Sequence, residues 1–275
     1  MIQFIVRKYQ NSVNLYYSKL KKEINGRLPN FIILGTQKGG TTSLYNYLAN
    51  HSKICTGSRR EVHFFDRNYE KGMNWYKSNF LNQNKNLFTF ECTPDYLHHP
   101  HIAKRIKLIT PKSKLIVLLR NPTERAISNY KHNLYLGKYS SNTTIEEIIE
   151  REKKYIKKEK EKMNGNHNYY SRKFKYLSLL DRGIYHKQLK RFFNEFDKNQ
   201  IHILFSENLF FNTRKELNKV FKFLNLYQEE VPCSRIYNKS KINLKIKNRT
   251  KIKLDEYFSN HNEQLYKMIE TKFKW

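Results

Sequence analysis

The sequence has few cysteines, no long apolar run and no pattern of a cleaved leader. Its three cysteines, Cys55, Cys92 and Cys233, are far apart and form neither a CxxC pair nor a zinc-site spacing, which excludes a disulfide framework. The opening MIQFIVRKYQ holds only five apolar residues before Arg7, whereas a membrane span needs roughly 18 to 20. No apolar region is followed by a small-residue cleavage site either. We therefore expect neither a signal peptide nor a membrane span, and a cytoplasmic location.

Acidic residues are also scarce. The 275 residues include 24 Asp and Glu against 53 Lys and Arg, which gives a formal net charge of +29. With 39% hydrophobic and 15% aromatic residues, the chain is too apolar for a disordered polycation and too charged for a membrane protein. A folded protein with this charge is expected to bind an anionic partner, such as nucleic acid, acidic lipid, a nucleotide or an acidic glycan. The alternative is that most of the lysines only solvate the surface.

The chain divides into a basic extension and one domain. Residues 1–28 form the extension, in which residues 2–24 have the pattern of a short basic amphipathic helix. A helix of this kind fits a peripheral contact with a membrane surface; packing on the domain or fraying is the alternative. Residues 29–275 are expected to form a single domain, because no repeat and no Pro- or Ser-rich linker interrupts them.

Apolar runs predict four buried strands, at residues 31–34, 87–90, 115–119 and 201–205. Helical patterns lie between and after them, at residues 43–50, 122–134, 143–163, 176–193, 213–224 and 255–273, and we expect a loop over 234–253. The third of these helices opens on a capping-box signature at residues 143–147. A strand, a glycine loop and a helix in this order open a parallel α/β sheet. The sequence therefore predicts an α/β fold with a central parallel sheet flanked by helices.

The segment Gly35–Ser43, GTQKGGTTS, has the composition of an anion-binding loop. Between a strand and a helix, such a loop directs backbone N–H groups and the positive end of the helix dipole at a bound anion. It is not the nucleotide-triphosphatase loop, because the lysine precedes the glycine pair instead of following it. The alternative is a glycine-rich turn with no ligand. The predicted ligand-binding residues are Lys38, Gly39, Gly40, Thr41, Thr42 and Ser43.

Two further clusters carry polar residues that fit chemistry. Arg120 follows a buried strand and Ser128 comes about two helical turns later, a pair that suits a second phosphate; a surface ion pair between Arg120 and Glu124 is the alternative. The second cluster is the segment 61–66, EVHFFD, in which a carboxylate and an imidazole could supply a general base. A loop with a partly buried histidine and two aromatic anchors is the alternative there.

Five segments together resemble the sulfotransferase superfamily that uses 3′-phosphoadenosine 5′-phosphosulfate (PAPS). They are FIILGTQKGGTTSL (31–44), REVHFFD (60–66), ECTPDYL (91–97), KLIVLLRNPTERAISNY (114–130) and IHILFSENL (201–209), in the family's order and spacing. The heparan sulfate branch is most similar, namely the glucosaminyl 3-O-sulfotransferases and the sulfotransferase domain of the N-deacetylase/N-sulfotransferases. The resemblance implies a P-loop-like three-layer fold and an enzyme that transfers a sulfuryl group to a hydroxyl or amine, most simply of a carbohydrate.

The resemblance also implies roles for individual residues on the donor side. The loop Lys38–Ser43 would wrap the 5′-phosphosulfate, and Lys38 would neutralise charge on the leaving phosphate. Arg120 and Ser128 would hold the 3′-phosphate. No metal is expected, because sulfuryl transfer needs positioning, a base and stabilisation of a departing anion.

On the acceptor side, Glu61 matches the family's catalytic base, and His63 and Asp66 match residues that line the acceptor site. The chain departs from the family at Cys92, where relatives commonly carry a lysine that contributes to acceptor binding. Cys233 is also the only cysteine after Cys92, so the C-terminal disulfide of many relatives cannot form. The Lys-Gly-Arg loop that closes over the adenosine is matched only loosely, by residues 237–241 or 247–249.

Other functions stay open from the sequence. The acceptor could be a small-molecule alcohol, a lipid or a protein tyrosine. A nucleotide kinase would need a magnesium ligand and a triphosphate loop, and neither is found. A polyanion-binding module would need a basic stripe independent of Lys38 and Glu61. We expect no nucleic-acid partner, because the sequence has no ribonucleoprotein, zinc-finger or helix-turn-helix signature.

Overall fold

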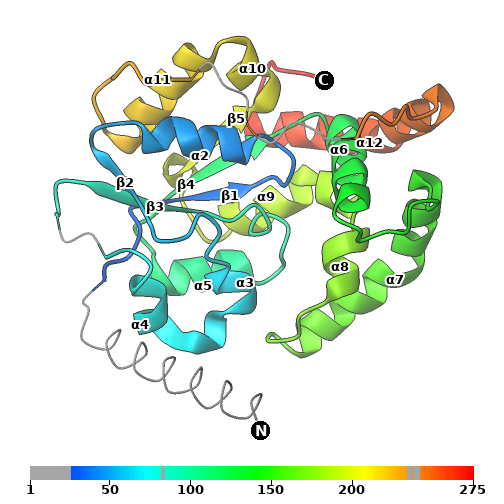
Figure 1. The fold of residues 1–275 in the computed structure, drawn as a ribbon, viewed down its shortest axis with the longest axis horizontal. Helices are drawn as coiled ribbons and strands as arrows, with labels where there is room; N and C mark the ends of the chain where they lie inside the picture. The colour runs from blue at the N-terminus through cyan, green and yellow to red at the C-terminus, as the bar shows by residue number, and fades with distance from the viewer. Residues whose placement is uncertain (1–25, 82–83, 234–236, 238–241) are drawn as a thin grey trace, which may run out of the picture.

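Five parallel strands form a central sheet in the order β2-β3-β1-β4-β5 (Figure 1). In this computed structural model, residues 26–81, 84–233, 237 and 242–275 are described. The strands are β1 (Phe31–Gly35), β2 (Ile54–Thr56), β3 (Phe88–Cys92), β4 (Lys114–Leu119) and β5 (Ile201–Phe205). The predicted fold class, a central parallel sheet flanked by helices, is confirmed.

Alternate residues of the central strand β1 face opposite layers, as the two-residue period of a strand requires. Phe31 and Ile33 pack in one apolar cluster, whereas Ile32 and Leu34 pack in another, and all four side chains are fully buried. A strand that is covered on both faces is a continuous apolar run. This is why the run FIIL was recognisable in the sequence.

Helices cover both faces of the sheet (Figure 1). One face carries α2 (Thr41–Ala49), α10 (Ser206–Phe211) and α11 (Thr213–Leu224). The other carries α3 (Phe64–Arg67), α4 (Gly72–Lys77), α5 (Ile102–Ile109), α9 (Tyr185–Phe193) and the end of α12 (Asn248–Ile269). Three 3₁₀ turns lie at Tyr69–Lys71, Asp181–Gly183 and Lys198–Gln200. The sheet and its two helical layers form the predicted three-layer arrangement.

A separate apolar cluster joins the helices beside the sheet, α6 (Pro122–Tyr135), α7 (Ile145–Gly165) and the first half of α12. Helix α8 (Arg172–Leu177) lies against α7. The predicted capping box of α7 is confirmed: the Thr144 hydroxyl accepts the Glu147 N–H at 3.2 Å, and the Glu147 carboxylate accepts the Thr144 N–H at 3.3 Å. These reciprocal bonds satisfy donors that the helix start leaves without partners.

The helix predicted over 176–193 is wrong in its first half. Helix α8 ends at Leu177, and α9 begins only at Tyr185. Between them, the buried Glu152 carboxylate accepts the N–H groups of Leu180 and Asp181 at 2.7 and 2.8 Å. A Cβ on Gly183 would lie 2.5 Å from the Phe258 ring. The tight packing against α12 and the bonds to α7 therefore favour an irregular turn over a continuous helix.

Other boundaries also differ from the predictions. The loop predicted over 234–253 is wrong at its end, because α12 begins at Asn248; Thr250, Leu254 and Phe258 recur every fourth residue on its buried side. The short strand β2 and helix α5 were not predicted. The predicted amphipathic helix at residues 2–24 and its membrane contact lie outside the described residues. Among the residues that the structure describes, no helix has the length and apolarity to cross a bilayer.

Candidate functional site

The loop that follows β1 forms the centre of the candidate site. It runs from Gly35 to Gly40, and α2 then begins at Thr41. Gly40 caps the helix with a φ of 94°, and Lys38 also has a positive φ, 67°. A Cβ on Gly39 would lie 2.8 Å from the Leu118 carbonyl oxygen, so only glycine allows the loop to approach β4 this closely. The first N–H groups of α2 point out of the helix start and suit an anion.

Lys38 and Arg120 bring two positive charges together at this loop. Arg120 follows β4, the neighbour of β1 in the sheet, and its guanidinium donates to the Lys38 carbonyl at 3.1 Å. Burial and the Arg120 charge lower the pKa of Lys38 to about 8. The predicted alternative partner, Glu124, lies 3.9 Å from Arg120, and its side chain is half exposed. So weak a pair leaves the guanidinium available to a second anion.

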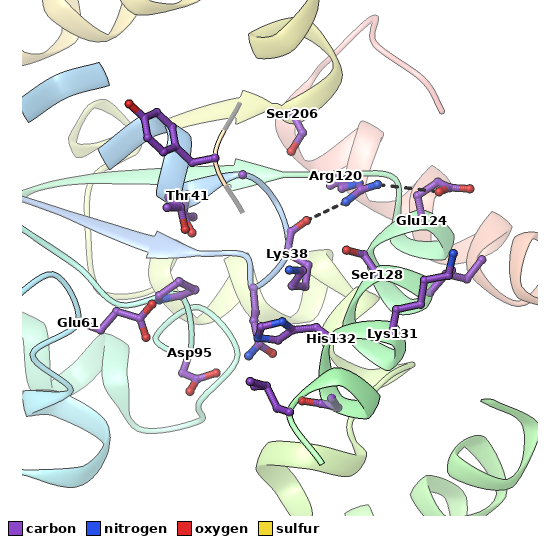
Figure 2. A pocket seen from close by; sticks show the side chains of 18 of the residues that line it. Lys38, Thr41, Glu61, Asp95, Arg120, Glu124, Ser128, Lys131, His132 and Ser206 are labelled. Atoms are coloured by element: carbon purple, nitrogen blue, oxygen red, sulfur yellow. Dashed lines mark hydrogen bonds and ion pairs between the residues drawn. The ribbon is translucent and has the colours of Figure 1, made fainter. Parts of the chain in front are cut away.

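The loop opens into a cleft of about 880 Å³ at the carboxyl ends of β1 and β4 (Figure 2). This is where open parallel sheets bind ligands. Helix α6 forms one wall, to which it contributes Ser128, Lys131 and His132, and Ser128 and His132 lie next to Lys38. The structure thus brings the predicted residues Lys38, Arg120 and Ser128 to one side of a single cleft.

The remaining predicted loop residues divide into two groups. Gly40, Thr41 and Thr42 line the cleft. Gly39 and Ser43 do not: the Gly39 N–H donates to Thr36 at 3.0 Å, and the fully buried Ser43 hydroxyl accepts the Tyr237 N–H at 3.0 Å. The Ser43 hydroxyl therefore ties Tyr237 to α2, which the sequence did not indicate.

Glu61, His63 and Asp66 lie together. The His63 imidazole stands between two carboxylates, with Nε2 3.3 Å from Glu61 and Nδ1 2.8 Å from Asp66. Although burial opposes its charge, these two hydrogen bonds raise the pKa of His63 to about 9. Burial likewise opposes ionisation of Glu61, but the bond from His63 and the charges of His63 and Arg60 lower its pKa. At neutral pH the cluster is thus a carboxylate held by an imidazolium, and Glu61 faces the cleft (Figure 2).

The segment that carries this cluster turns directly after His63. His63 has a positive φ of 52° and the helical turn α3 starts directly after it. The turn brings Asp66 back onto His63, so that three residues of one short segment form one ion-pair chain.

Asp95 continues the charged network at the base of the cleft. Its carboxylate lies 2.9 Å from Arg182, 3.2 Å from Arg67 and 3.6 Å from Lys175. These cations hold the pKa of Asp95 well below its usual range in spite of burial. His63, Asp66 and Asp95 are close enough in the described chain to share a metal ion. Because three cations already surround Asp95, this cluster does not have the surplus negative charge of a typical cation site.

Sequence reasoning missed several residues that line the cleft. Lys131 and His132 follow Ser128 by three and four residues, so the helical period could have placed them on the same face of α6. Burial and the Lys38 charge lower the pKa of His132, which keeps this imidazole neutral at pH 7. Four further residues that line the cleft come from other segments and were not predicted as site residues, although Asp95 and Ser206 lie in two of the segments that resemble the family. They are Asp95, Lys175, Ser206 and Phe210.

Comparisons with known proteins agree with this arrangement. The model of the sulfotransferase domain family matches residues 28–274. The membrane-associated sulfotransferase kil1 of Dictyostelium discoideum is 28% identical over 90% of this chain and 66% of its own length. Heparan sulfate glucosamine 3-O-sulfotransferase 5 of Mus musculus is 35% identical over 73% of this chain and 54% of its own length. The predicted resemblance to the heparan sulfate branch is confirmed.

The fold has a solved counterpart. A sulfotransferase from Alicyclobacillus acidocaldarius superposes with a TM-score of 0.74 at 22% identity, over 90% of this chain and 98% of that chain. At this identity the likeness concerns the fold. The chain spans about half to two thirds of the length of the two curated relatives.

Proposed function

We propose that this chain, which belongs to the sulfotransferase domain family, transfers a sulfuryl group from PAPS to a hydroxyl or amine of a carbohydrate acceptor. Residues 29–275 act as one sulfotransferase domain. One observation carries the proposal: an anion-binding loop with two cations and a carboxylate held by an imidazolium open into the same cleft. The first part suits a donor with two separated anionic groups, and the second suits removal of a proton from an acceptor.

On the donor side, the 5′-phosphosulfate lies on the loop Lys38–Thr42 at the start of α2, and the 3′-phosphate is bound by Arg120 and Ser128. Gly39 and Ser43 act through the loop backbone and its packing, because their own groups are engaged within the protein. An arginine fork binds a phosphate more strongly and more directionally than a neutral donor does. Arg120 therefore distinguishes PAPS from nucleotides that lack the 3′-phosphate.

In the transfer step, the acceptor oxygen or nitrogen attacks sulfur in line. The bond from sulfur to the 5′-phosphate oxygen breaks, and the acceptor proton passes to the Glu61 carboxylate. Because the pKa of Glu61 is lowered, its carboxylate is a weak base and must accept the proton in concert with sulfur transfer. Lys38 balances the charge that develops on the departing phosphate. His63 and Asp66 orient Glu61 and border the acceptor, and the step uses no metal.

A carbohydrate acceptor is supported by the relatives whose names specify heparan sulfate glucosamine. Two cations near Glu61 and Asp95, Arg60 and Lys175, also line the cleft and fit a glycan that carries acidic groups.

The donor assignment is tested by isothermal titration with adenosine 3′,5′-bisphosphate and with 5′-AMP. We expect the bisphosphate to bind much more tightly, and equal affinities would contradict the assignment. The acceptor is tested by transfer of radiolabelled sulfate from PAPS to heparan sulfate, a phenol and a sterol. Labelling of the phenol or the sterol alone would replace the carbohydrate by one of those acceptors.

A further inference from the structure

A fully buried carboxylate, Glu91, lies behind the segment that carries the proposed base. Within the described part of the chain Glu91 forms no ion pair, and three hydroxyl groups donate hydrogen bonds to it. Tyr76 donates to Oε2 at 2.5 Å, and Tyr96 and Thr93 donate to Oε1 at 2.5 and 3.0 Å. All four side chains are fully buried. Burial of a carboxylate costs free energy because it disfavours the charged form, and the three hydroxyl donors offset part of this cost.

Two of these three hydroxyls also bind the backbone of the catalytic segment. The Tyr96 oxygen accepts the Phe65 N–H at 3.2 Å, and the Thr93 oxygen accepts the His63 N–H at 3.4 Å. A backbone N–H can only donate, so each hydroxyl oxygen accepts at this contact and must direct its single proton elsewhere. In its ionised form the Glu91 carboxylate only accepts, and it accepts a hydrogen bond from both hydroxyls.

The segment needs such support at His63. Its φ of 52° is a left-handed conformation that a residue with a side chain rarely adopts, and it persists only where the surroundings fix it. His63 is also the residue that holds both Glu61 and Asp66. A loss of support under His63 and Phe65 would therefore move the proposed base.

We propose that Glu91 is a positioning residue: through the hydroxyls of Tyr96 and Thr93, it fixes the turn that presents Glu61 to the acceptor. This inference rests on the proposed role of Glu61 as the base. Burial, opposed by the three hydroxyl bonds, raises the pKa of Glu91 to about 7. Burial and the Glu91 charge raise the pKa values of Tyr76 and Tyr96 well above their usual range, which keeps both hydroxyls protonated as donors.

The chain offers a matched pair of variants as a test. Tyr96→Phe and Tyr76→Phe each remove one hydroxyl from Glu91 and keep a fully buried ring, but only the Tyr96 hydroxyl binds the catalytic segment. We expect Tyr96→Phe to lower kcat for transfer from PAPS to heparan sulfate by about tenfold or more, since small misplacements of catalytic groups have effects of this size. Tyr76→Phe should retain kcat. Adenosine 3′,5′-bisphosphate should bind both variants as it binds the wild type.

A second measurement needs no acceptor. The pKa of His63, followed by NMR of its ring protons, reports on its contacts with Glu61 and Asp66, on the Arg67 cation and on nearby Asp95. Tyr96→Phe should lower this pKa from about 9 towards the ordinary value, whereas Tyr76→Phe should leave it unchanged. If wild-type protein transferred no sulfate, the proposed function would fail while this comparison would still test the position of His63.

Should Tyr96→Phe not fold, Thr93→Val and Thr93→Ser provide the same contrast. Valine removes the hydroxyl at nearly constant volume, and serine keeps it. We expect Thr93→Val to lower both kcat and the pKa of His63, and Thr93→Ser to keep both close to their wild-type values. Equal kcat and equal His63 pKa in Tyr96→Phe and Tyr76→Phe, or in the two Thr93 variants, would overturn the proposal and leave Glu91 with a purely structural role.

Discussion

Removal of the Arg120 side chain tests whether the cleft binds a 3′-phosphate through this residue. In the free protein the Arg120 guanidinium makes one hydrogen bond to the Lys38 carbonyl, at 3.1 Å, and an ion pair of 3.9 Å with the half-exposed Glu124. A bound phosphate would add at least one charge-assisted hydrogen bond, worth about 1.5–3 kcal/mol. At about 1.4 kcal/mol per factor of ten, Arg120→Ala should weaken the binding of adenosine 3′,5′-bisphosphate about 10- to 150-fold.

The assay is isothermal titration of wild-type protein and variants with the bisphosphate and with 5′-AMP. The loss in Arg120→Ala should be much smaller for 5′-AMP, because only the contact to the 3′-phosphate is specific to the bisphosphate. Glu124→Gln is a matched control, since it removes the other partner of Arg120 from the rim of the cleft. It should leave bisphosphate binding unchanged or slightly stronger. If Arg120→Ala weakened both ligands by the same factor, Arg120 would support the loop and would not bind the 3′-phosphate.

Three further predictions follow from the geometry of the cleft. Glu61→Gln should lower kcat for transfer from PAPS to heparan sulfate about 100-fold or more, because the proton acceptor is lost, while bisphosphate binding measured by titration stays intact; an active variant would remove Glu61 as the base. Binding of the bisphosphate should take up protons near pH 8 and weaken at higher pH. Burial and a neighbouring guanidinium lower the pKa of Lys38 to about 8 in the free protein, whereas a bound phosphate favours the charged form of Lys38. Titrations in buffers with different ionisation enthalpies measure the proton uptake, and its absence would count against a contact with Lys38. Gly39→Ala should weaken bisphosphate binding and lower the free energy of unfolding by about 1–3 kcal/mol. Gly165→Ala, where a Cβ meets open space, should change neither quantity. Urea denaturation measures the free energy of unfolding and titration measures the binding; equal values for the two variants would mean that the loop tolerates a side chain at Gly39.

The parts of the fold with strong local signals could be predicted from the sequence. The run from Phe31 to Leu34 is apolar on both faces because β1 is central, and Gly35 marks its end. The capping box of Thr144 and Glu147 fixes the start of α7 with two side-chain bonds that need no tertiary partner. Signals of this kind arise within a few residues, so a single sequence contains them.

Elements that depend on distant partners could not be predicted in this way. Strand β2 has three residues, of which only Ile54 is buried, so it shows no period. The break before α9 depends on the Glu152 carboxylate from α7 and on the close approach of Phe258 to Gly183. A helical pattern alone contains none of these contacts, which explains why the predicted helix over 176–193 was too long.

The candidate site shows the same division. Lys38, Arg120 and Glu61 follow strands or lie in recognisable motifs, and the structure brings all three to one cleft. The burial of the Ser43 hydroxyl against the Tyr237 N–H could not be expected, because the two residues are 194 positions apart in the sequence. Local sequence patterns therefore identified residues that line the cleft, whereas the exposure of each side chain depended on long-range packing.

The position of Cys92 sharpens the question of the acceptor. Its buried side chain packs under α2, with the thiol 3.9 Å from the Thr41 carbonyl oxygen, and burial raises the pKa of the thiol. It thus cannot provide the positive charge of the lysine that the resemblance to the heparan sulfate branch leads us to expect at this position. Lys175 of α8 lines the cleft instead and is held at 3.6 Å by Asp95, which also binds Arg67 and Arg182.

Of the three cations around Asp95, only Lys175 also lines the cleft, and α8 supplies it rather than β3. Under the proposed function, the preference for an acidic glycan would therefore reside in the segment around α8. The net charge of +29 spread over the chain attracts anions of any kind. Only charges fixed inside the cleft, such as Lys175, can select where on an acceptor the sulfuryl group is placed.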